Sequence, residues 1–108
     1  MHKSLISIAL ALASLGAQAG ELHTVTLVLR DGQLIPPQLE VPANTRFKIV
    51  LRNEGRGPAE FESRSLRKEK VLAPGASSFV VVAPLKPGVY DMFDEFHEKT
   101  AIGTIVAK

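Results

Sequence analysis

Apolar and polar residues alternate along several short stretches of the chain, a spacing typical of β-strands with one buried face. In residues 24–29 and 46–53, every second residue is large and apolar. Residues 78–85 form a continuous apolar and β-branched run, which also indicates a strand. Shorter strands are predicted in residues 89–93 and 101–108, and at a sheet edge from residue 38, where Pro42 and a turn at Ala43-Asn44 end the strand. The predicted core face of the first two strands comprises Val25, Leu27, Leu29, Phe47, Ile49 and Leu51.

Proline and glycine separate these stretches. Asp31-Gly32 is a turn pair, Pro36-Pro37 excludes a helix, and residues 86–88 (Lys-Pro-Gly) turn the chain again. No stretch shows convincing amphipathic-helix periodicity, although residues 63–70 could form one short helical turn. We therefore predict about seven strands in an all-β Greek-key sandwich.

The N-terminus has the pattern of a secretory leader. Lys3 precedes an apolar run over residues 5–15, and the small-x-small sequence of residues 17–19 follows. The apolar run is shorter than the roughly 18–20 residues that a membrane span needs. We predict a cleaved signal peptide over residues 1–19, one domain over residues 20–108 without a membrane span, and a periplasmic location.

The amino-acid composition excludes several kinds of site and partner. The sequence contains no cysteine, which removes disulfides as a source of stability and thiolate as a metal ligand. The formal net charge is only +2, so nucleic acid is not an expected partner. No nucleophile elbow, phosphate-binding glycine loop or histidine pair at zinc spacing is present.

Acidic residues and a histidine gather between the last two predicted strands, at Asp91, Asp94, Glu95, His97 and Glu98. Carboxylates this close repel one another unless a positive charge lies among them. In a tight loop, Asp94 and His97 could converge on one ion; in a continued strand, Glu95 and His97 would share a face. Glu98 is expected to face solvent. The neighbouring aromatic residues are expected to pack in the core, and they are Tyr90, Phe93 and Phe96.

Two further carboxylates, Glu60 and Glu62, flank Phe61 on an earlier segment. If this segment is extended, both point the same way while Phe61 enters the core. They could supply the opposite half of a metal site, or form surface ion pairs with nearby cations. We expect these cations to form a solvated face; the alternative is a docking patch for an acidic partner. The cations are Arg56, Arg64, Arg67, Lys68 and Lys70.

Residues 53–63 (NEGRGPAEFES) and 90–106 (YDMFDEFHEKTAIGTIV) together resemble the metal-binding loops of the cupredoxins. In that family the first loop supplies a histidine, and the second supplies Cys-x-x-His and then a methionine. The matching positions here are Ala59 or Glu60 for the first histidine, Asp94 for the cysteine, His97 for the second histidine and Ala101 for the methionine. The resemblance implies the fold without the thiolate that a blue-copper site needs. Carboxylates with one imidazole suit iron, or copper bound without sulfur.

A more specific resemblance is to the cupredoxin-like domains of bacterial ferrous-iron uptake systems, the EfeO type. It is carried by residues 60–75 (EFESRSLRKEKVLAPG), 84–97 (PLKPGVYDMFDEFH) and 100–106 (TAIGTIV). It implies an exported domain that binds iron or copper and assists iron uptake, by ferroxidase-type oxidation of Fe(II) or by transfer. The partner would be a periplasmic iron-binding protein or a membrane permease.

The predicted ligands are Glu60, Glu62, Asp94, Glu95 and His97. The alternative hypothesis is a metal-free secreted β-sandwich that binds another protein. The two hypotheses differ in whether the segments around residues 60 and 95 meet in the fold.

Overall fold

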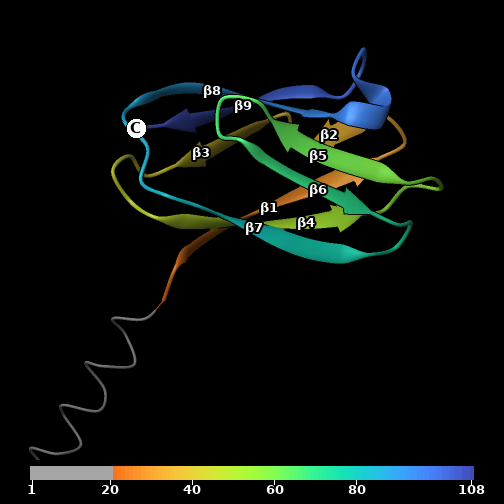
Figure 1. Ribbon diagram of the computed structural model, residues 1–108, viewed down its shortest axis with the longest axis horizontal. Helices are drawn as coiled ribbons and strands as arrows, with labels where there is room; N and C mark the ends of the chain where they lie inside the picture. Colours follow the sequence, from red (N-terminus) through yellow and green to blue (C-terminus); the bar gives the residue numbers. More distant parts are fainter. Residues whose placement is uncertain (1–20) are drawn as a thin grey trace, which may run out of the picture.

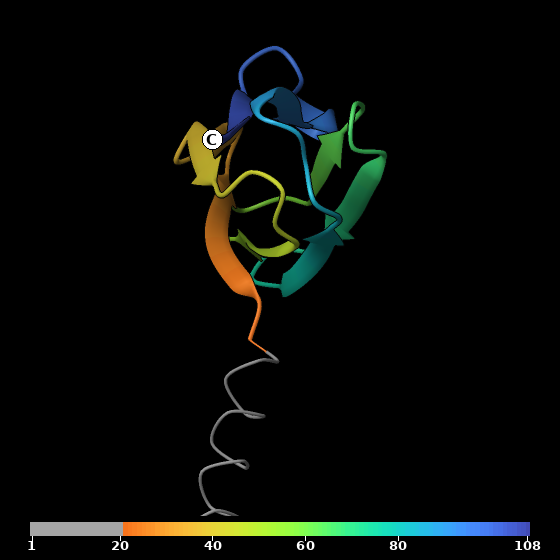
Figure 2. The same cartoon turned by 90° about the vertical axis from the view of Figure 1, so that its left-hand side faces the viewer.

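A computed structural model describes residues 21–108, and the predicted leader over residues 1–19 lies outside the described residues. Two β-sheets pack face to face, as Figures 1 and 2 show from two directions. Within residues 21–108, no helix has the length and apolar character needed to cross a membrane. The predicted all-β sandwich is confirmed.

The four-stranded sheet has the order β2-β1-β4-β7, and the five-stranded sheet has the order β3-β9-β8-β5-β6. The first sheet comprises β1 (His23–Arg30), β2 (Gln33–Ile35), β4 (Phe47–Asn53) and β7 (Ser77–Val82). The second comprises β3 (Gln38–Val41), β5 (Ala59–Ser63), β6 (Lys68–Leu72), β8 (Gly88–Asp94) and β9 (Ile102–Ala107). One short 3₁₀ helix, η1 (Glu95–His97), follows β8. Strand β3 lies at a sheet edge, as its sequence predicted.

The alternating pattern of β1 and β4 produces the core as predicted. Leu27 and Leu51 are paired across these parallel strands, and both are fully buried, as are Leu29, Phe47 and Ile49. Complete burial of such a side chain contributes about 1.5–3 kcal/mol relative to exposure. Inward-facing residues of the second sheet, including Phe61, complete a single core.

The short helical turn considered for residues 63–70 is not formed. Instead, β5 and β6 make an antiparallel hairpin connected by a turn over residues 64–67. The carboxylate of Asp91 on β8 holds this turn, because it accepts hydrogen bonds from the backbone N–H of Arg64 and of Ser65. Although burial opposes the shift, hydrogen bonds from Ser65 and Arg64 lower the pKa of Asp91. A contact from a distant strand therefore decides the local conformation.

The prediction that three aromatic residues pack in the core is wrong for Phe96, whose side chain is 50% exposed on η1. Tyr90 packs partly against the core, and its hydroxyl donates to the carbonyl oxygen of Lys86. Phe93 is only 7% exposed but lies on the outer face of the sheet, beside Glu62 of β5. Its burial comes from surface neighbours as well as from the sheet.

Strand β9 approaches the chain near Pro37 very closely at Gly103. A Cβ atom at this position would lie 2.3 Å from the carbonyl oxygen of Pro37 and 2.9 Å from Cε of Met92. The same carbonyl oxygen accepts a hydrogen bond from the backbone N–H of Thr104. Glycine is required here by the space between the two strands.

Candidate metal centre

Asn53, at the end of β4, organises the loop that leads to the first predicted ligands. Its side chain is 2% exposed, and its Nδ2 donates to the carbonyl oxygens of Gly57 and Leu72. Its Oδ1 accepts from the backbone N–H of Gly55. These three hydrogen bonds fix where residues 54–58 run and where β5 begins.

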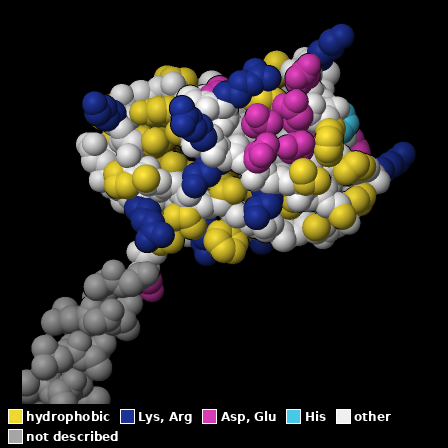
Figure 3. All heavy atoms as spheres, viewed as in Figure 1, with side chains coloured by type: hydrophobic (Ala, Val, Ile, Leu, Met, Phe, Trp, Pro, Cys, Tyr) yellow, Lys and Arg dark blue, Asp and Glu magenta, His cyan; other side chains and the backbone are white. Residues whose placement is uncertain are grey.

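On β5 the predicted alternation holds, with Phe61 fully buried and Glu60 and Glu62 partly buried on the outer face of the sheet. Glu62 is directly opposite Glu69 of β6. One carboxylate oxygen from each of Glu60, Glu62 and Glu69 lies within 4.8 Å of the other two. We call these three residues the glutamate cluster. Figure 3 shows acidic side chains gathered on the side of the molecule where Figure 1 draws β5 and β6.

Glu95 adds a fourth carboxylate from the second loop. Its carboxylate lies close enough to Glu62 to raise the pKa of the Glu62 carboxyl, and its Oε2 is buried without a donor among the described residues. Two carboxylates can share a hydrogen bond only if one of them holds a proton. Glu95 therefore holds a buried carboxylate oxygen without a donor among the described residues, which a cation or a proton would satisfy.

The cluster is electrostatically strained. Partial burial, followed by the charges of Glu69 and Glu95, raises the pKa of Glu60. Partial burial and the proximity of Glu95 likewise raise the pKa of Glu62. Within residues 21–108, no lysine or arginine nitrogen lies within 4.0 Å of these carboxylates. The alternative in which Glu60 and Glu62 form ion pairs with the nearby cations is thus not realised.

Asp94 and His97 form a separate pair. Asp94 is 1% exposed, and its Oδ1 accepts from the backbone N–H groups of Glu60 and Phe96, at 2.9 and 3.0 Å. Its Oδ2 lies 2.9 Å from Nδ1 of His97. The bond from Glu60 ties the first loop directly to the second. With both oxygens occupied in this way, Asp94 is arranged to orient His97, and Nε2 is the ring nitrogen left for a metal.

The ring of His97 packs against the β1–β2 turn. A Cβ atom at Gly32 would lie 3.4 Å from Cδ2 of His97 and 3.0 Å from Oγ1 of Thr100. The Thr100 hydroxyl donates to the carbonyl oxygen of Gly32 at 2.8 Å. A surface pocket of about 460 Å³ is lined by His97 and its neighbours in residues 95–100, so the histidine is accessible from solvent.

The structure therefore brings the two predicted segments together but divides the residues into two groups. Glu60 and Glu62 belong to the glutamate cluster with Glu95 beside them, whereas Asp94 and His97 are paired with each other. His97 lies outside the 4.8 Å group, and Glu98 is exposed as expected. Metal binding by the five residues stays a prediction. Glu69 was missed, and the signal that could have found it is the hairpin register, which places residue 69 opposite residue 62.

Sequence comparison identifies the family. A family model described as a cupredoxin-like domain matches residues 3–107. The chain belongs to the cupredoxin-like domain family. An uncharacterized protein of Rickettsia prowazekii (strain Madrid E) is 38% identical to this cupredoxin-like chain over 82 residues. The alignment covers 76% of this chain and 66% of the relative, just under two thirds of its length.

Similar solved structures agree with the cupredoxin-like fold. Auracyanin from the photosynthetic bacterium Roseiflexus castenholzii, reduced with sodium dithionite, has a TM-score of 0.69 and 12% identity. The match covers 82% of this chain and 99% of that one. Auracyanin B also has a TM-score of 0.69, with 15% identity, and the match covers 80% of this chain and 88% of that chain. At these identities the similarity shows the fold alone.

This cupredoxin-like protein does not carry the ligand set of a blue-copper site. The sequence has no cysteine, so no thiolate is present. Asp94 stands where the resemblance places the family cysteine, and its carboxylate is occupied by three hydrogen-bonding groups. What the donor set offers instead is oxygen from glutamates and one imidazole nitrogen.

Proposed function

We propose that this cupredoxin-like protein binds a metal ion at the glutamate cluster and assists iron uptake outside the cytoplasm. The observation that carries the proposal is the gathering of Glu60, Glu62 and Glu69 within 4.8 Å, with no lysine or arginine within 4.0 Å among residues 21–108. A cation would relieve the repulsion that raises the pKa of two of these groups. Glu95, with its buried unpartnered oxygen, would join them.

The donor chemistry fits a hard cation. Carboxylate oxygens favour iron and other hard ions over copper in its reduced state, and an imidazole extends the range to oxidised copper. We therefore keep iron and copper as the candidate ions, with iron as cargo. Several carboxylates stabilise a trivalent ion more than a divalent one, which favours loss of an electron from Fe(II).

His97 would act through Nε2, because Nδ1 is held by Asp94 at 2.9 Å. A carboxylate on the far ring nitrogen of a metal-binding histidine fixes the tautomer and the ring orientation. His97 lies on the same short helix as Glu95, two residues along the chain. In this proposal Asp94 positions the ring of His97 and is not itself a metal ligand.

The proposed setting is the periplasm, with a periplasmic iron-binding protein or a membrane permease as partner. The leader pattern of residues 1–19 and the resemblance to iron-uptake domains support this setting. Three or four protein ligands leave coordination positions free, which suits transfer or oxidation better than storage. The partly buried position of the glutamates keeps the ion within reach of a second protein.

The test is a calorimetric titration of the purified protein with Cu(II), Fe(II) under anaerobic conditions, and Fe(III) held soluble by a weak ligand. Glu62→Gln and Glu69→Gln are each expected to weaken binding by at least tenfold, because each removes a charged ligand. Glu40→Gln is the matched control, since Glu40 lies on β3 of the same sheet and, within residues 21–108, forms its ion pair with Lys108 alone. Equal affinities in all four proteins would refute the cluster as the metal site.

The alternative of a metal-free interaction module is favoured by exposed apolar side chains near the cluster. Phe96 is 50% exposed on η1, and Ile102 is 60% exposed on β9. Single exposed apolar residues are common on soluble proteins. Absence of binding to all three ions, with the fold intact, would leave this alternative as the better function.

A further inference from the structure

A group of cations lies against the glutamate cluster without neutralising it. A surface pocket of about 340 Å³ is lined by Glu62 and Glu69 together with three basic residues and Ser63. The basic residues are Arg64, Arg67 and Lys68. Among the described residues, none of the three forms an ion pair within 4.0 Å. Opposite charges that share one pocket but do not pair leave both sets free for a ligand.

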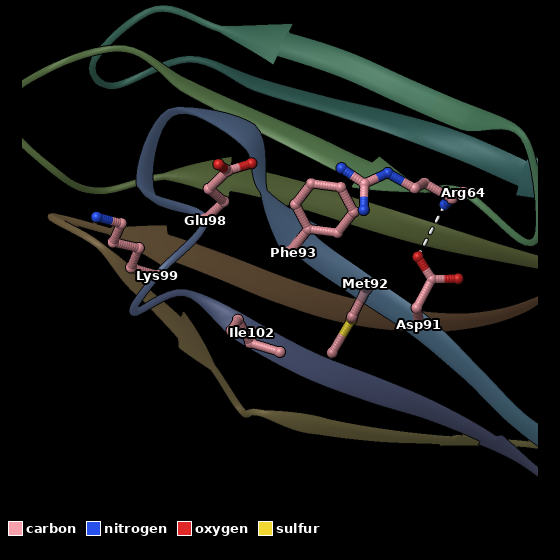
Figure 4. Close-up of a pocket in the computed structure, with 7 residues that line it drawn as sticks. All are labelled: Arg64, Asp91, Met92, Phe93, Glu98, Lys99 and Ile102. Atoms are coloured by element: carbon pink, nitrogen blue, oxygen red, sulfur yellow. Dashed lines mark hydrogen bonds between the residues drawn. The ribbon is translucent and has the colours of Figure 1, made fainter.

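Arg64 forms no ion pair with the described glutamates because its side chain packs on Phe93 and its backbone is hydrogen-bonded to Asp91. Its guanidinium lies over the ring of Phe93, 4.6 Å from the centroid, as Figure 4 shows. Its backbone N–H donates to Asp91 at 2.9 Å, which fixes the start of the turn. The planar guanidinium is thereby held on the outer face of the sheet beside β5, and no carboxylate of residues 21–108 forms an ion pair with it.

The backbone conformation of Arg67 is unfavourable for an arginine. Its φ is +55°, in the left-handed region that glycine and asparagine adopt more easily than arginine. Turn chemistry alone would select one of those residues here. An arginine at this position supplies the pocket with a cation that the hairpin itself does not need.

We propose, building on the proposed function, that the metal is bound as a complex with a small anionic carboxylate chelator. In this arrangement the glutamates contact the metal, and Arg64, Arg67 and Lys68 receive the carboxylates of the chelator. Guanidinium groups suit this task because they bind carboxylates through two parallel hydrogen bonds. A bare cation would gain nothing from three neighbouring positive charges, which would only lower its affinity. An anionic chelate, in contrast, would be repelled by the glutamates unless such charges lay beside them.

The test compares Cu(II) with Cu(II)–citrate, using labelled citrate and equilibrium dialysis of the purified protein. The wild-type protein is expected to retain citrate together with Cu(II), and little citrate when the metal is omitted. Arg67→Asn is expected to lower the affinity for Cu(II)–citrate by about tenfold, through loss of a charge-assisted contact. The same variant is expected to raise the affinity for bare Cu(II) by about twofold, because a nearby positive charge is gone.

Lys70→Gln is the matched control, since it removes one positive charge from β6 at a position that does not line the pocket. Lys68→Gln repeats the experiment where the backbone is an ordinary strand. Because asparagine accepts a positive φ, the unfolding midpoint of Arg67→Asn is expected to equal or exceed that of the wild type.

Three outcomes would overturn the inference. One is binding of Cu(II) but not of Cu(II)–citrate, which would leave the proposed function standing. Another is retention of citrate to the same extent with and without metal, which would reveal a simple anion site. The third is an equal effect of Arg67→Asn, Lys68→Gln and Lys70→Gln on the citrate complex. Failure of bare Cu(II) and of the citrate complex alike to bind would refute the proposed function itself.

Discussion

Asp94 joins the two loops of the candidate site, so its replacement tests the architecture most directly. Replacing Asp94 with alanine removes the acceptor of the Glu60 and Phe96 backbone N–H groups and of His97. Each N–H left without a partner costs about 1–3 kcal/mol. Because both donors are partly shielded from water, we expect Asp94→Ala to lower the free energy of unfolding by about 3 kcal/mol.

For a domain of this size, 1 kcal/mol corresponds to about 4–8 °C in the unfolding midpoint. Asp94→Ala should therefore lower the midpoint by about 12–24 °C, measured by circular dichroism without added metal. Metal affinity should fall by about 10–100-fold where the variant remains folded, as expected when the partner of a histidine ligand is lost. A stability loss below about 1 kcal/mol would refute the three-bond network, since a single ordinary hydrogen bond already contributes that much.

Asp94→Asn separates stability from ligand orientation. The amide oxygen can still accept from the Glu60 and Phe96 backbone N–H groups, so stability should stay within about 1 kcal/mol of the wild type. The amide NH₂ would then face Nδ1 of His97, which must accept, so the ring hydrogen moves to Nε2. Metal affinity should fall although the fold is retained, and ¹⁵N NMR of the imidazole reports the tautomer. Wild-type affinity in this variant would exclude Nε2 of His97 as a ligand.

Two further predictions concern the cluster and the core. Without metal at pH 7, Glu62→Gln should be more stable than the wild type, because the raised pKa of Glu62 means that its ionised form is disfavoured in the folded protein. This stability advantage of Glu62→Gln should shrink as the pH falls through the raised pKa of Glu62 and vanish below the ordinary value of 4.5. Urea unfolding in EDTA at a series of pH values measures the difference in stability between the two proteins. A difference that stays constant with pH would contradict the prediction. Gly103→Ala should lower the free energy of unfolding by about 3 kcal/mol or more, because its Cβ would overlap the carbonyl oxygen of Pro37. Denaturant titration checks this expectation against Gly57→Ala, where a Cβ meets nothing within 4 Å.

Much of the fold could be predicted because its strands carry their own pattern. The alternation in β1 and β4 is local, and Leu27 and Ile49 are buried where it places them. The turn at Asp31-Gly32 is equally local, and both residues have positive φ. The prediction of about seven strands was low against the nine within residues 21–108, because β2 has only three residues and the first three residues of β6 are charged.

The site could be predicted only in part, because distant contacts arrange it. Nothing near residue 64 in the sequence announces that Asp91 will hold the turn, so a helical turn over residues 63–70 was a reasonable expectation. A helical turn there does not place Glu69 opposite Glu62, as the β5–β6 hairpin does, so Glu69 was not predicted as part of the site. The choice between Asp94 and Glu95 depended on strand β8 ending at Asp94, whose side chain then turns inward and is fully hydrogen-bonded. Phe96 was assigned to the core because a sequence does not show on which side a 3₁₀ turn presents its ring.

The hydrogen bonds of Asp94 also bear on when the protein could acquire an ion. The bond from the Glu60 backbone N–H fastens the two loops to each other with protein groups alone. Small metalloproteins whose loops are joined by a coordinated ion fold only when the metal binds, and chelators unfold them. Because protein groups already join the loops here, we expect an ion at the proposed site to bind and leave without unfolding the chain.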